Sequence, residues 1–365
     1  MHSYFLCVDC GGSKTSAVLS DSEGNIVGRA LGGPSNFAYL GLEVFLSSVS
    51  VAVSNVLQTC TSPPAKEAVS LPPPEGITIM KAWFGISGVD SPAAVDAVTP
   101  SLSKMLGIPE GPRLVVANDT NLLAAPIRLH PDVSHGIAVI AGTGSIGVSY
   151  HLGSSGGLEE YGRVGGWGWM LGDEGGGASV GREAVRQVLQ AWEQATLDQK
   201  EVESVLAKDL LSLYKIGSAP DILALIHRPD PPAAASIPKE LNIPDTRPPH
   251  LTQVREKRLS NLSPLVFKAA FEHGDPLAFN ILRTCAGQLV DQIATLLTTA
   301  EARTARRVVA SEAVLSFGGS LALIDSYRTL ILEALEKKGH VFKYVELVDD
   351  AAAVGAKGLA MEAKQ

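Results

Sequence analysis

A strand, a glycine turn, a second strand and a hairpin turn occur twice in this chain, 132 residues apart. In the first copy Gly12 and Ser13 lie in the glycine turn, and the hairpin turn covers 21–24. In the second copy Gly144 and Ser145 take the same places, and the hairpin turn covers 153–156. A repeat on this scale predicts two related domains that each carry a β-hairpin and face each other, not a solenoid.

Apolar periodicity predicts an α/β fold around these hairpins. We expect strands at 4–9, 16–20, 25–32, 77–86, 114–117, 135–140, 146–151, 313–317 and 344–348. We expect helices at 41–58, 92–106, 182–195, 201–213, 221–226, 259–272, 276–299, 325–338 and 350–363. The segment 228–249 holds seven prolines and is predicted to be an exposed insert.

Length and charge limit the classes of function. A chain of 365 residues is too long for one compact domain, so two are expected. The net charge of −8 argues against a nucleic-acid or anionic-membrane partner, and we interpret the basic segment Arg255–Arg258 as a solvated helix surface. No apolar run is expected to reach the ~18–20 residues of a membrane span. The N-terminus does not resemble a signal peptide, because Asp9 interrupts its apolar run.

The cysteines are few and scattered, at Cys7, Cys10, Cys60 and Cys285. Cys7 and Cys10 have the C-x-x-C spacing of redox and metal sites. The run around them is predicted to be a strand, however, in which residues three apart point to opposite faces. Scattered cysteines suit a reducing compartment, so a cytoplasmic location is expected.

Each glycine turn is a candidate phosphate site. A strand, a glycine turn and a second strand expose successive backbone N–H groups and hydroxyls that can hold phosphate oxygens. Such turns are common and singly are weak evidence, but here they form a repeated pair. Asp9 precedes the first turn, and its carboxylate could hold Mg²⁺ through water, since hard cations prefer oxygen ligands. The Walker A spacing of P-loop proteins is absent.

Asn118 and Asp119 follow a predicted buried strand and precede a helix that begins at Thr120. A carboxylate is thereby placed at the C-terminal edge of a sheet, where α/β folds bind ligands. Asp119 could accept or orient the proton of an attacking hydroxyl in phosphoryl transfer. It could equally cap the helix at Thr120, and the local sequence does not decide between these roles.

The stretch 164–181 holds eight glycines around two tryptophans and the acidic pair Asp173 and Glu174. Glycine allows positive φ and close backbone approach. The indole of Trp167 offers a flat face to a sugar ring, and the Asp173 carboxylate can accept two hydroxyl hydrogen bonds. We interpret the stretch as a polar small-molecule site, with a flexible surface loop as the alternative.

Together these motifs resemble the N-acetylglucosamine kinase family, one of the BadF/BadG/BcrA/BcrD-type ATPases in the actin–hexokinase–Hsp70 superfamily. The resemblance covers nearly the whole chain. Residues 9–15 resemble the first phosphate motif, 140–145 the second phosphate motif, and 317–320 the adenosine motif. Residues 165–175 match the family's glycine-rich motif, and 85–90 match the strand end that precedes the catalytic segment. Cys10, Ser13 and Gly176 depart from the family pattern, which usually has serine at the last of these positions.

The resemblance implies two ribonuclease H-like domains of the actin/hexokinase type around a nucleotide and sugar cleft. The first would be 1–119 with the C-terminal helix 352–365, and the second 120–351 with the insert. Asp119 would be the catalytic base, and Asp9 would hold Mg²⁺. The sugar would be held by Asn36, Asn118, Asp119, Gly166, Trp167 and Asp173. ATP would be held by Gly12, Ser13, Lys14, Thr15, Thr143, Gly144, Ser145, Gly318, Gly319 and Ser320.

The activity that the resemblance implies is ATP- and Mg²⁺-dependent phosphorylation of the 6-hydroxyl of N-acetylglucosamine. Glucosamine is the nearest alternative substrate. An ATPase that activates a redox enzyme is an alternative of another class, but it would need cysteines placed for an iron–sulfur cluster. A sugar-kinase-related repressor would need a helix-turn-helix and a basic face, and neither is evident. The implied partners are a small-molecule sugar and ATP, and a homodimer is left open.

Overall fold

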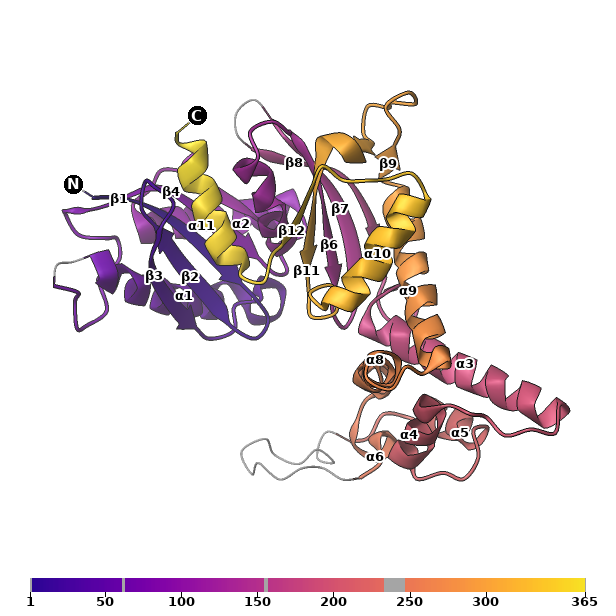
Figure 1. Cartoon of the computed structure of the whole chain (residues 1–365). Coiled ribbons are helices and arrows are strands. Elements are labelled where there is room, and N and C mark those ends of the chain that lie inside the picture. Colours follow the sequence, from indigo (N-terminus) through magenta and orange to yellow (C-terminus); the bar gives the residue numbers. More distant parts are fainter. Residues whose placement is uncertain (1, 61–62, 154–156, 233–246, 365) are drawn as a thin grey trace.

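Two five-stranded mixed sheets form the framework of the computed structural model, which describes residues 2–60, 63–153, 157–232 and 247–364. The two sheets lie in separate lobes, and the indigo-to-purple N-terminal lobe stands beside the lobe that contains β6 to β8 (Figure 1). The middle of the proline-rich insert and the second hairpin turn lie outside the described residues.

The first sheet has the strand order β3-β2-β1-β4-β5. Its β1–β2 and β2–β3 pairs are antiparallel, whereas β1, β4 and β5 run parallel. Such parallel pairs need long crossover connections, here helical, and they bring the carboxyl ends of three strands to one edge. The bounds are β1 His2–Cys10, β2 Thr15–Ser20, β3 Ile26–Gly32, β4 Ile77–Ile86 and β5 Leu114–Asn118.

The second sheet repeats this topology in the order β12-β11-β6-β7-β8, so the predicted internal repeat is confirmed. Strand β7 pairs antiparallel with β6 and β8, and β11 and β12 continue in parallel on the other side of β6. The bounds are β6 His135–Ala141, β7 Ser145–Leu152, β8 Leu158–Gly165, β11 Ala313–Gly318 and β12 Tyr344–Leu347. No strand was predicted at β8, because its sequence lacks a clear apolar alternation.

Helices connect and cover the sheets. In the first half these are α1 Phe37–Val56, α2 Pro92–Leu106 and the 3₁₀ segments η1 Leu57–Cys60 and η2 Asp119–Leu129. In the second half they are α3 Gly177–Leu197, α4 Val205–Tyr214, α5 Asp221–His227, α6 Pro249–Thr252, α7 Arg255–Ser260, α8 Ser263–Phe271, α9 Pro276–Ala294, α10 Asp325–Lys337 and α11 Ala351–Glu362. The short strands β9 Leu297–Thr298 and β10 Val308–Val309 pair with each other.

Four predicted helices are wrong in extent, and two of these, expected at 182–195 and 201–213, instead begin at Gly177 and Val205. The helix expected at 259–272 is divided into α7 and α8, because Pro264 stands in the first turn of α8 and a proline cannot continue a helix from the preceding turn. The helix expected at 276–299 ends at Ala294, and the chain then forms β9.

Helix α1 with η1 is long and apolar enough to cross a membrane by length and composition, so the expectation that no segment reaches this length is wrong. In the structure this helix packs on β2 and β3 of the first sheet. Phe45, Val49 and Val53 are fully buried in the core there. The buried apolar side chains of α1 therefore cover the first sheet.

The C-terminal helix α11 returns to the first sheet, where it packs on β1, β2 and η2 (Figure 1). Glu362 of α11 pairs with the buried Arg128 of η2 and with Lys81, whose Nζ lies 2.7 Å from Glu362 Oε1. The Arg128 guanidinium also lies 5.0 Å from the centre of the Trp83 ring. These contacts hold α11 against the first sheet, and the division into 1–119 with 352–365 and 120–351 stays a prediction.

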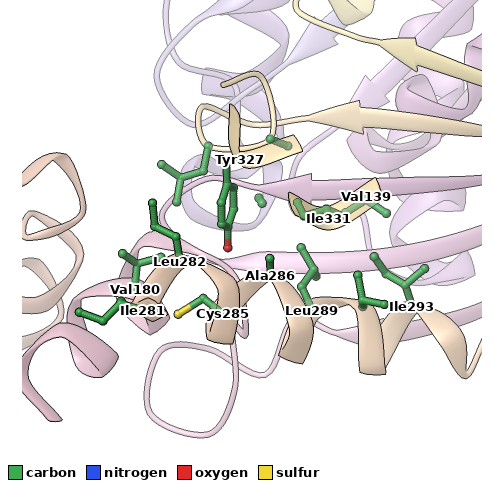
Figure 2. Packing of buried hydrophobic residues seen from close by; sticks show 14 of the residues in the cluster. Val139, Val180, Ile281, Leu282, Cys285, Ala286, Leu289, Ile293, Tyr327 and Ile331 are labelled. Carbon is green, nitrogen blue, oxygen red and sulfur yellow. The ribbon is translucent and has the colours of Figure 1, made fainter. Parts of the chain in front are cut away.

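The core beside the second sheet also supports the glycine-rich stretch. Helices α9 and α10 pack together, and Figure 2 shows Tyr327 of α10 pointing toward the row of side chains that includes Leu282, Cys285 and Leu289 of α9. The Tyr327 hydroxyl donates a 2.9 Å hydrogen bond to the carbonyl oxygen of Gly175. The glycine-rich stretch is therefore tied to the core.

The prediction for the C-x-x-C pair is confirmed, because Cys7 and Cys10 lie in apolar clusters on opposite faces of β1 and all four cysteines are free. The interpretation of Arg255–Arg258 as a solvated surface is wrong for Arg258, which is fully buried. Its guanidinium donates to a ring of backbone carbonyls, those of Leu225, Ile226, Arg228, Pro229 and Gln253. It thereby holds α5, α7 and the start of the insert together.

Candidate active site

Three polar side chains lie close to the carboxyl ends of the parallel strands β1, β4 and β5, at one edge of the first sheet. The register aligns Cys10 of β1 with Ile86 of β4 and Asn118 of β5. Asp9 therefore lies just inside this edge, and Ser87 and Asp119 lie just beyond it. The backbone N–H of Ser87 also donates to the carbonyl of Cys10 at 2.9 Å. This is the position at which α/β folds bind ligands.

Asp119 is largely buried at this edge, and burial raises the pKa of its carboxyl group, while a hydrogen bond from Ser87 opposes that rise. The N-cap of η2 is Asn118, whose Oδ1 accepts hydrogen bonds from the Thr120 backbone N at 3.0 Å and the Thr120 hydroxyl at 2.7 Å. The cap role that was considered for Asp119 therefore belongs to Asn118. A partly desolvated carboxylate with a raised pKa suits a proton acceptor.

Asn36, at the start of α1, also lies at this edge of the first sheet. It is the N-cap of α1, where its Oδ1 accepts from the Tyr39 backbone N at 3.1 Å, and its Nδ2 donates to Ser87 Oγ at 3.1 Å. Ser87 thus links Asn36 to Asp119. Gly88 has a φ of +85°, and a side chain there would put its Cβ 2.8 Å from the Asn36 Oδ1 atom. The glycine allows this close approach.

Ser87 and Asp90 were missed as individual site residues, although the motif 85–90 was singled out. Asp90 Oδ1 accepts a 2.7 Å hydrogen bond from the Nδ2 of Asn118 and so fixes the residue before Asp119. The signal was their position directly after a predicted strand, at the same edge as the two aspartates.

The first glycine turn presents Gly12, Ser13 and Lys14 to solvent. Thr15, by contrast, is fully buried, and its Oγ1 lies 2.7 Å from both the Gly33 carbonyl oxygen and Ser35 Oγ. The exposed part of the turn can meet a phosphate group, whereas the Thr15 hydroxyl anchors the turn to the loop after β3.

Asp9 lies behind this turn in a largely desolvated position. Burial and the nearby Asp119 carboxylate raise the pKa of Asp9 to about 6, although Lys14 acts in the opposite direction. A bound cation would relieve both effects, so the residue fits a Mg²⁺ site. Among the described residues no cluster of three His, Cys, Asp or Glu side chains could hold a metal ion alone. The arrangement therefore suits a Mg²⁺ ion held mainly by phosphate oxygens and water.

The second glycine turn packs against the start of α3. The backbone N–H of Gly177 donates to the Gly142 carbonyl at 2.8 Å, and that of Ala178 donates to the Thr143 carbonyl at 3.0 Å. Gly176 makes this approach feasible, since a Cβ at that position would lie 2.6 Å from the backbone C of Gly144. The turn thus lies at a helix N-terminus, which favours anions.

The glycine-rich stretch places its predicted sugar residues in different surroundings. Trp167 is 64% exposed, and Gly166 before it has a φ of +70° and donates from its backbone N–H to the Ser145 carbonyl at 2.9 Å. Asp173 is buried, has a φ of +61°, and its Oδ1 lies 3.4 Å from the Ser145 backbone N. The indole face is available to a ligand, whereas the carboxylate lies against the second glycine turn.

A pocket of about 430 Å³ connects the second turn with the adenosine motif, since Thr143 and Ser320 both line it. Gly318 ends β11, and Gly319 has a φ of +85°, where an added Cβ would lie 2.7 Å from the carbonyl group of Ala141. The far side of the pocket is formed by Ser260, Asn261 and Ser263, which were not predicted. The signal for them was the Ser263-Pro264 step that divides α7 from α8.

Two curated proteins are similar to this chain over most of its length. An N-acetyl-D-glucosamine kinase from Dictyostelium discoideum is 27% identical over 79% of this chain and 77% of its own. An N-acetylmuramic acid/N-acetylglucosamine kinase from Clostridium acetobutylicum is 27% identical over 78% of this chain and 76% of its own.

Among solved structures, a candidate N-acetylglucosamine kinase from Porphyromonas gingivalis superposes with a TM-score of 0.57 at 21% identity, covering 98% of both chains. This likeness confirms the α/β fold of the actin/hexokinase type. The model of the BadF/BadG/BcrA/BcrD ATPase family matches residues 6–363, nearly the whole chain. The protein therefore belongs to the BadF/BadG/BcrA/BcrD ATPase family.

Proposed function

We propose that this protein is an ATP-dependent sugar kinase that transfers phosphate to the 6-hydroxyl of N-acetylglucosamine, with Asp119 as the base. The observation that carries the proposal is the chain of contacts from Asn36 through Ser87 to Asp119, at the sheet edge that also holds Asp9. Both curated relatives carry N-acetylglucosamine kinase in their names, which supports the choice of sugar.

In this proposal the two glycine turns hold the phosphates of ATP. Ser13 and Lys14 offer exposed donors from the first turn, and the second turn adds the dipole of α3. The pocket between Thr143 and Ser320 takes the adenosine. A Mg²⁺ ion bound through Asp9 would neutralise charge on the phosphates.

The sugar would lie beside Asn36 and Asp119, with the exposed face of Trp167 and the Asp173 carboxylate approaching from the other half of the chain. Asp119 would accept the hydroxyl proton as the sugar oxygen bonds to the terminal phosphorus, while the bond from that phosphorus to the bridging oxygen breaks and ADP leaves. Ser87 would keep the carboxylate oriented. Phosphoryl transfer depends mainly on such positioning and on excluding water, so closure around the sugar would assemble the reactive geometry.

Two alternative functions can be compared with the same structure. Glucosamine differs from N-acetylglucosamine only at carbon 2, and it remains the nearest competing substrate. An activator of a redox enzyme would need cysteines at a shared accessible place for an iron–sulfur cluster. Cys7, Cys10 and Cys285 are instead buried in apolar clusters, and Cys7 and Cys10 lie on opposite faces of one strand.

The experiment is ADP release by the full chain with Mg²⁺ and ATP, measured against N-acetylglucosamine, glucosamine, N-acetylmuramic acid and glucose. The proposal predicts the highest kcat/KM for N-acetylglucosamine and little ADP release without sugar. ADP release that no sugar accelerates would overturn the kinase proposal. A preference for glucosamine would overturn only the choice of substrate.

A further inference from the structure

A second pocket, of about 410 Å³, lies away from both glycine turns, between helices α3, α5 and α7. Its volume is in the range of small-molecule sites. Trp169 and Met170 form one wall, and most of the other lining side chains are apolar, including Leu189, Leu223 and Ile226. Met170 is 68% exposed and Leu223 is 47% exposed, so this apolar surface is open to solvent. We call it the α3/α5/α7 pocket.

Among the residues that the structure describes, every charged or titratable side chain that lines the α3/α5/α7 pocket is basic, although the whole chain carries a net charge of −8. These side chains are Arg182, Arg186, His227 and Arg255. A pocket with an apolar floor and a basic rim favours a ligand that is both apolar and negatively charged, because an uncharged apolar ligand would form no ionic contact with the arginines of the rim. A ligand with a negative end would satisfy both parts.

The two outer arginines keep donors for such a ligand. Arg186 uses Nη1 to reach Glu183 at 2.9 Å, and Arg255 uses Nε to reach Asp230 at 3.3 Å. In the part of the chain that the structure describes, the Nη2 of Arg186 and both Nη atoms of Arg255 have no hydrogen-bond partner. A guanidinium has five N–H donors in a planar fork, which matches the paired oxygens of a carboxylate or phosphate.

We propose that the α3/α5/α7 pocket binds a small amphiphile, with its apolar body against Leu223 and Ile226 and one terminal carboxylate or phosphate at Arg186 and Arg255. The pocket also adjoins the site described above through Arg182. The Arg182 side chain donates to the Trp169 carbonyl at 3.1 Å and to both Glu174 carboxylate oxygens at 2.9 Å. A ligand that moves Trp169 or Arg182 therefore acts on the segment that carries Asp173.

The first test is fluorescence titration of the full chain with 8-anilinonaphthalene-1-sulfonate, an aromatic probe with one anionic group. The proposal predicts saturable binding at one site. Leu223→Glu puts a like charge on the pocket floor and should weaken binding roughly tenfold or more. Leu197→Glu is the matched control, because Leu197 is an exposed leucine, 79% exposed, at the end of α3 and outside the pocket.

The second test examines the basic rim. Arg255→Ala should weaken probe binding roughly threefold to tenfold, the range for a lost charge-assisted hydrogen bond at a partly exposed site. Arg303→Ala is its control, since Arg303 is similarly exposed and paired with a single glutamate, Glu312. The neutral analogue N-phenyl-1-naphthylamine should bind the parent protein more weakly than the sulfonate probe and should not respond to Arg255→Ala.

Competition identifies the natural end group. Octanoate or octyl phosphate should displace the probe, and the one that displaces it at lower concentration shows whether the pocket prefers a carboxylate or a phosphate. Octanol, which is uncharged, should not displace the probe. The proposal is overturned if the neutral probe binds as tightly as the sulfonate probe, or if the control variants lower affinity as much as the pocket variants. It is also overturned if sedimentation shows a dimer that Leu223→Glu converts to monomer, because a second copy would then cover the pocket.

The link to Asp173 rests on the proposed function and is tested separately. A saturating amount of the preferred amphiphile should change the KM for N-acetylglucosamine at least twofold in the parent protein. It should leave the KM unchanged in Leu223→Glu. An unchanged KM in the parent protein, with probe binding intact, would overturn the link and leave both the pocket and the kinase proposal standing.

Discussion

The Oδ1 atom of Asp173 lies 3.4 Å from the backbone N of Ser145, in the second glycine turn. Gly144 allows this contact, because a Cβ at that position would lie 2.7 Å from the other carboxylate oxygen. Asp173 also has a φ of +61°, a conformation that is uncommon for residues other than glycine and is often found at functional sites. One carboxylate therefore lies where the predicted phosphate turn meets the predicted sugar loop.

This position predicts opposite effects of Asp173→Asn on the two ligands. Asparagine tolerates the positive φ, so the loop should keep its shape. Loss of the charge should weaken N-acetylglucosamine binding by roughly 1.5–3 kcal/mol, the range for hydrogen bonds to charged groups. An ATP analogue without sugar should bind at least as tightly as before, because a negative charge beside the phosphate turn is removed.

Isothermal titration calorimetry of each ligand into both proteins measures these effects, and small-angle scattering follows compaction when sugar binds. A variant that binds sugar and compacts like the parent protein would show that the stretch 164–181 has a structural role only.

Asp119→Asn should lower turnover roughly 10²–10⁴-fold, the range for acid–base groups, and should hardly change the affinity for ATP. The reason is that the amide keeps the shape and the contact with Ser87 but cannot take the hydroxyl proton. Steady-state kinetics with N-acetylglucosamine measure the effect. Asp96→Asn, at an exposed position of α2, is the matched control. Near-normal turnover of Asp119→Asn would leave this residue without a catalytic role.

Asp9 should make the nucleotide-free protein less stable at neutral pH than at acid pH. Its pKa is raised to about 6 in the folded state, whereas the ordinary value is 3.8. Between these values the folded state holds more protons than the unfolded state, so stability falls as the pH rises toward 6. Above pH 6 the ionised carboxylate costs about 2–3 kcal/mol of folding free energy, an upper limit for a shift of this size.

Asp9→Asn removes this cost, so urea unfolding at pH 7 should show the variant to be the more stable protein. At pH 4 the two proteins should be nearly equal, because Asp9 is then protonated when folded. Asp96→Asn should show no such pH-dependent gain. Equal stability of Asp9→Asn and the parent protein at pH 7 would mean that the carboxylate is not desolvated as described.

Gly176→Ser introduces the residue usual in the family at a place where this chain has no room for it. The added Cβ would lie 2.6 Å from the backbone C of Gly144, so either the second glycine turn or the start of α3 must shift. We expect a loss of about 1–3 kcal/mol of stability, as for overpacking, together with weaker ATP binding. Gly217→Ser, which has open space around it, is the control in urea unfolding and nucleotide titration. An unchanged ATP affinity would contradict the packing described here.

The paired sheets could be predicted from the sequence because the repeat carries local signals in both copies, an apolar strand, a glycine turn and a second strand. The candidate site at the edge of the first sheet could be predicted only in part. Asp9 is the last residue of one predicted strand, and Asp119 follows another closely. A carboxylate at such a position is enough to predict a site residue. Their link through Ser87 to Asn36 depends on the parallel register of three strands, and no local pattern encodes that pairing.

Other parts of the site were hidden for different physical reasons. The contact of Asp173 with Ser145 arises from several positive-φ glycines in one loop, whose combined course a sequence pattern does not specify. Arg258 belongs to a basic run of the kind that is usually exposed. Its partners are backbone carbonyls, which every residue has, so no sequence pattern indicates that it is buried. Ser260 and Ser263 line the proposed nucleotide pocket, but the sequence predicts one continuous helix there and so did not single them out.

The most direct measurement for the central claim is the identity of the phosphorylated product. The full chain is incubated with Mg²⁺, ATP and N-acetylglucosamine, and the product is analysed by two-dimensional ¹H–³¹P correlation spectroscopy. The proposed function predicts a phosphorus signal coupled to the two protons on carbon 6, formed by the parent protein and lost in Asp119→Asn. Phosphorus on any other oxygen, or release of free phosphate without a sugar phosphate, would contradict it.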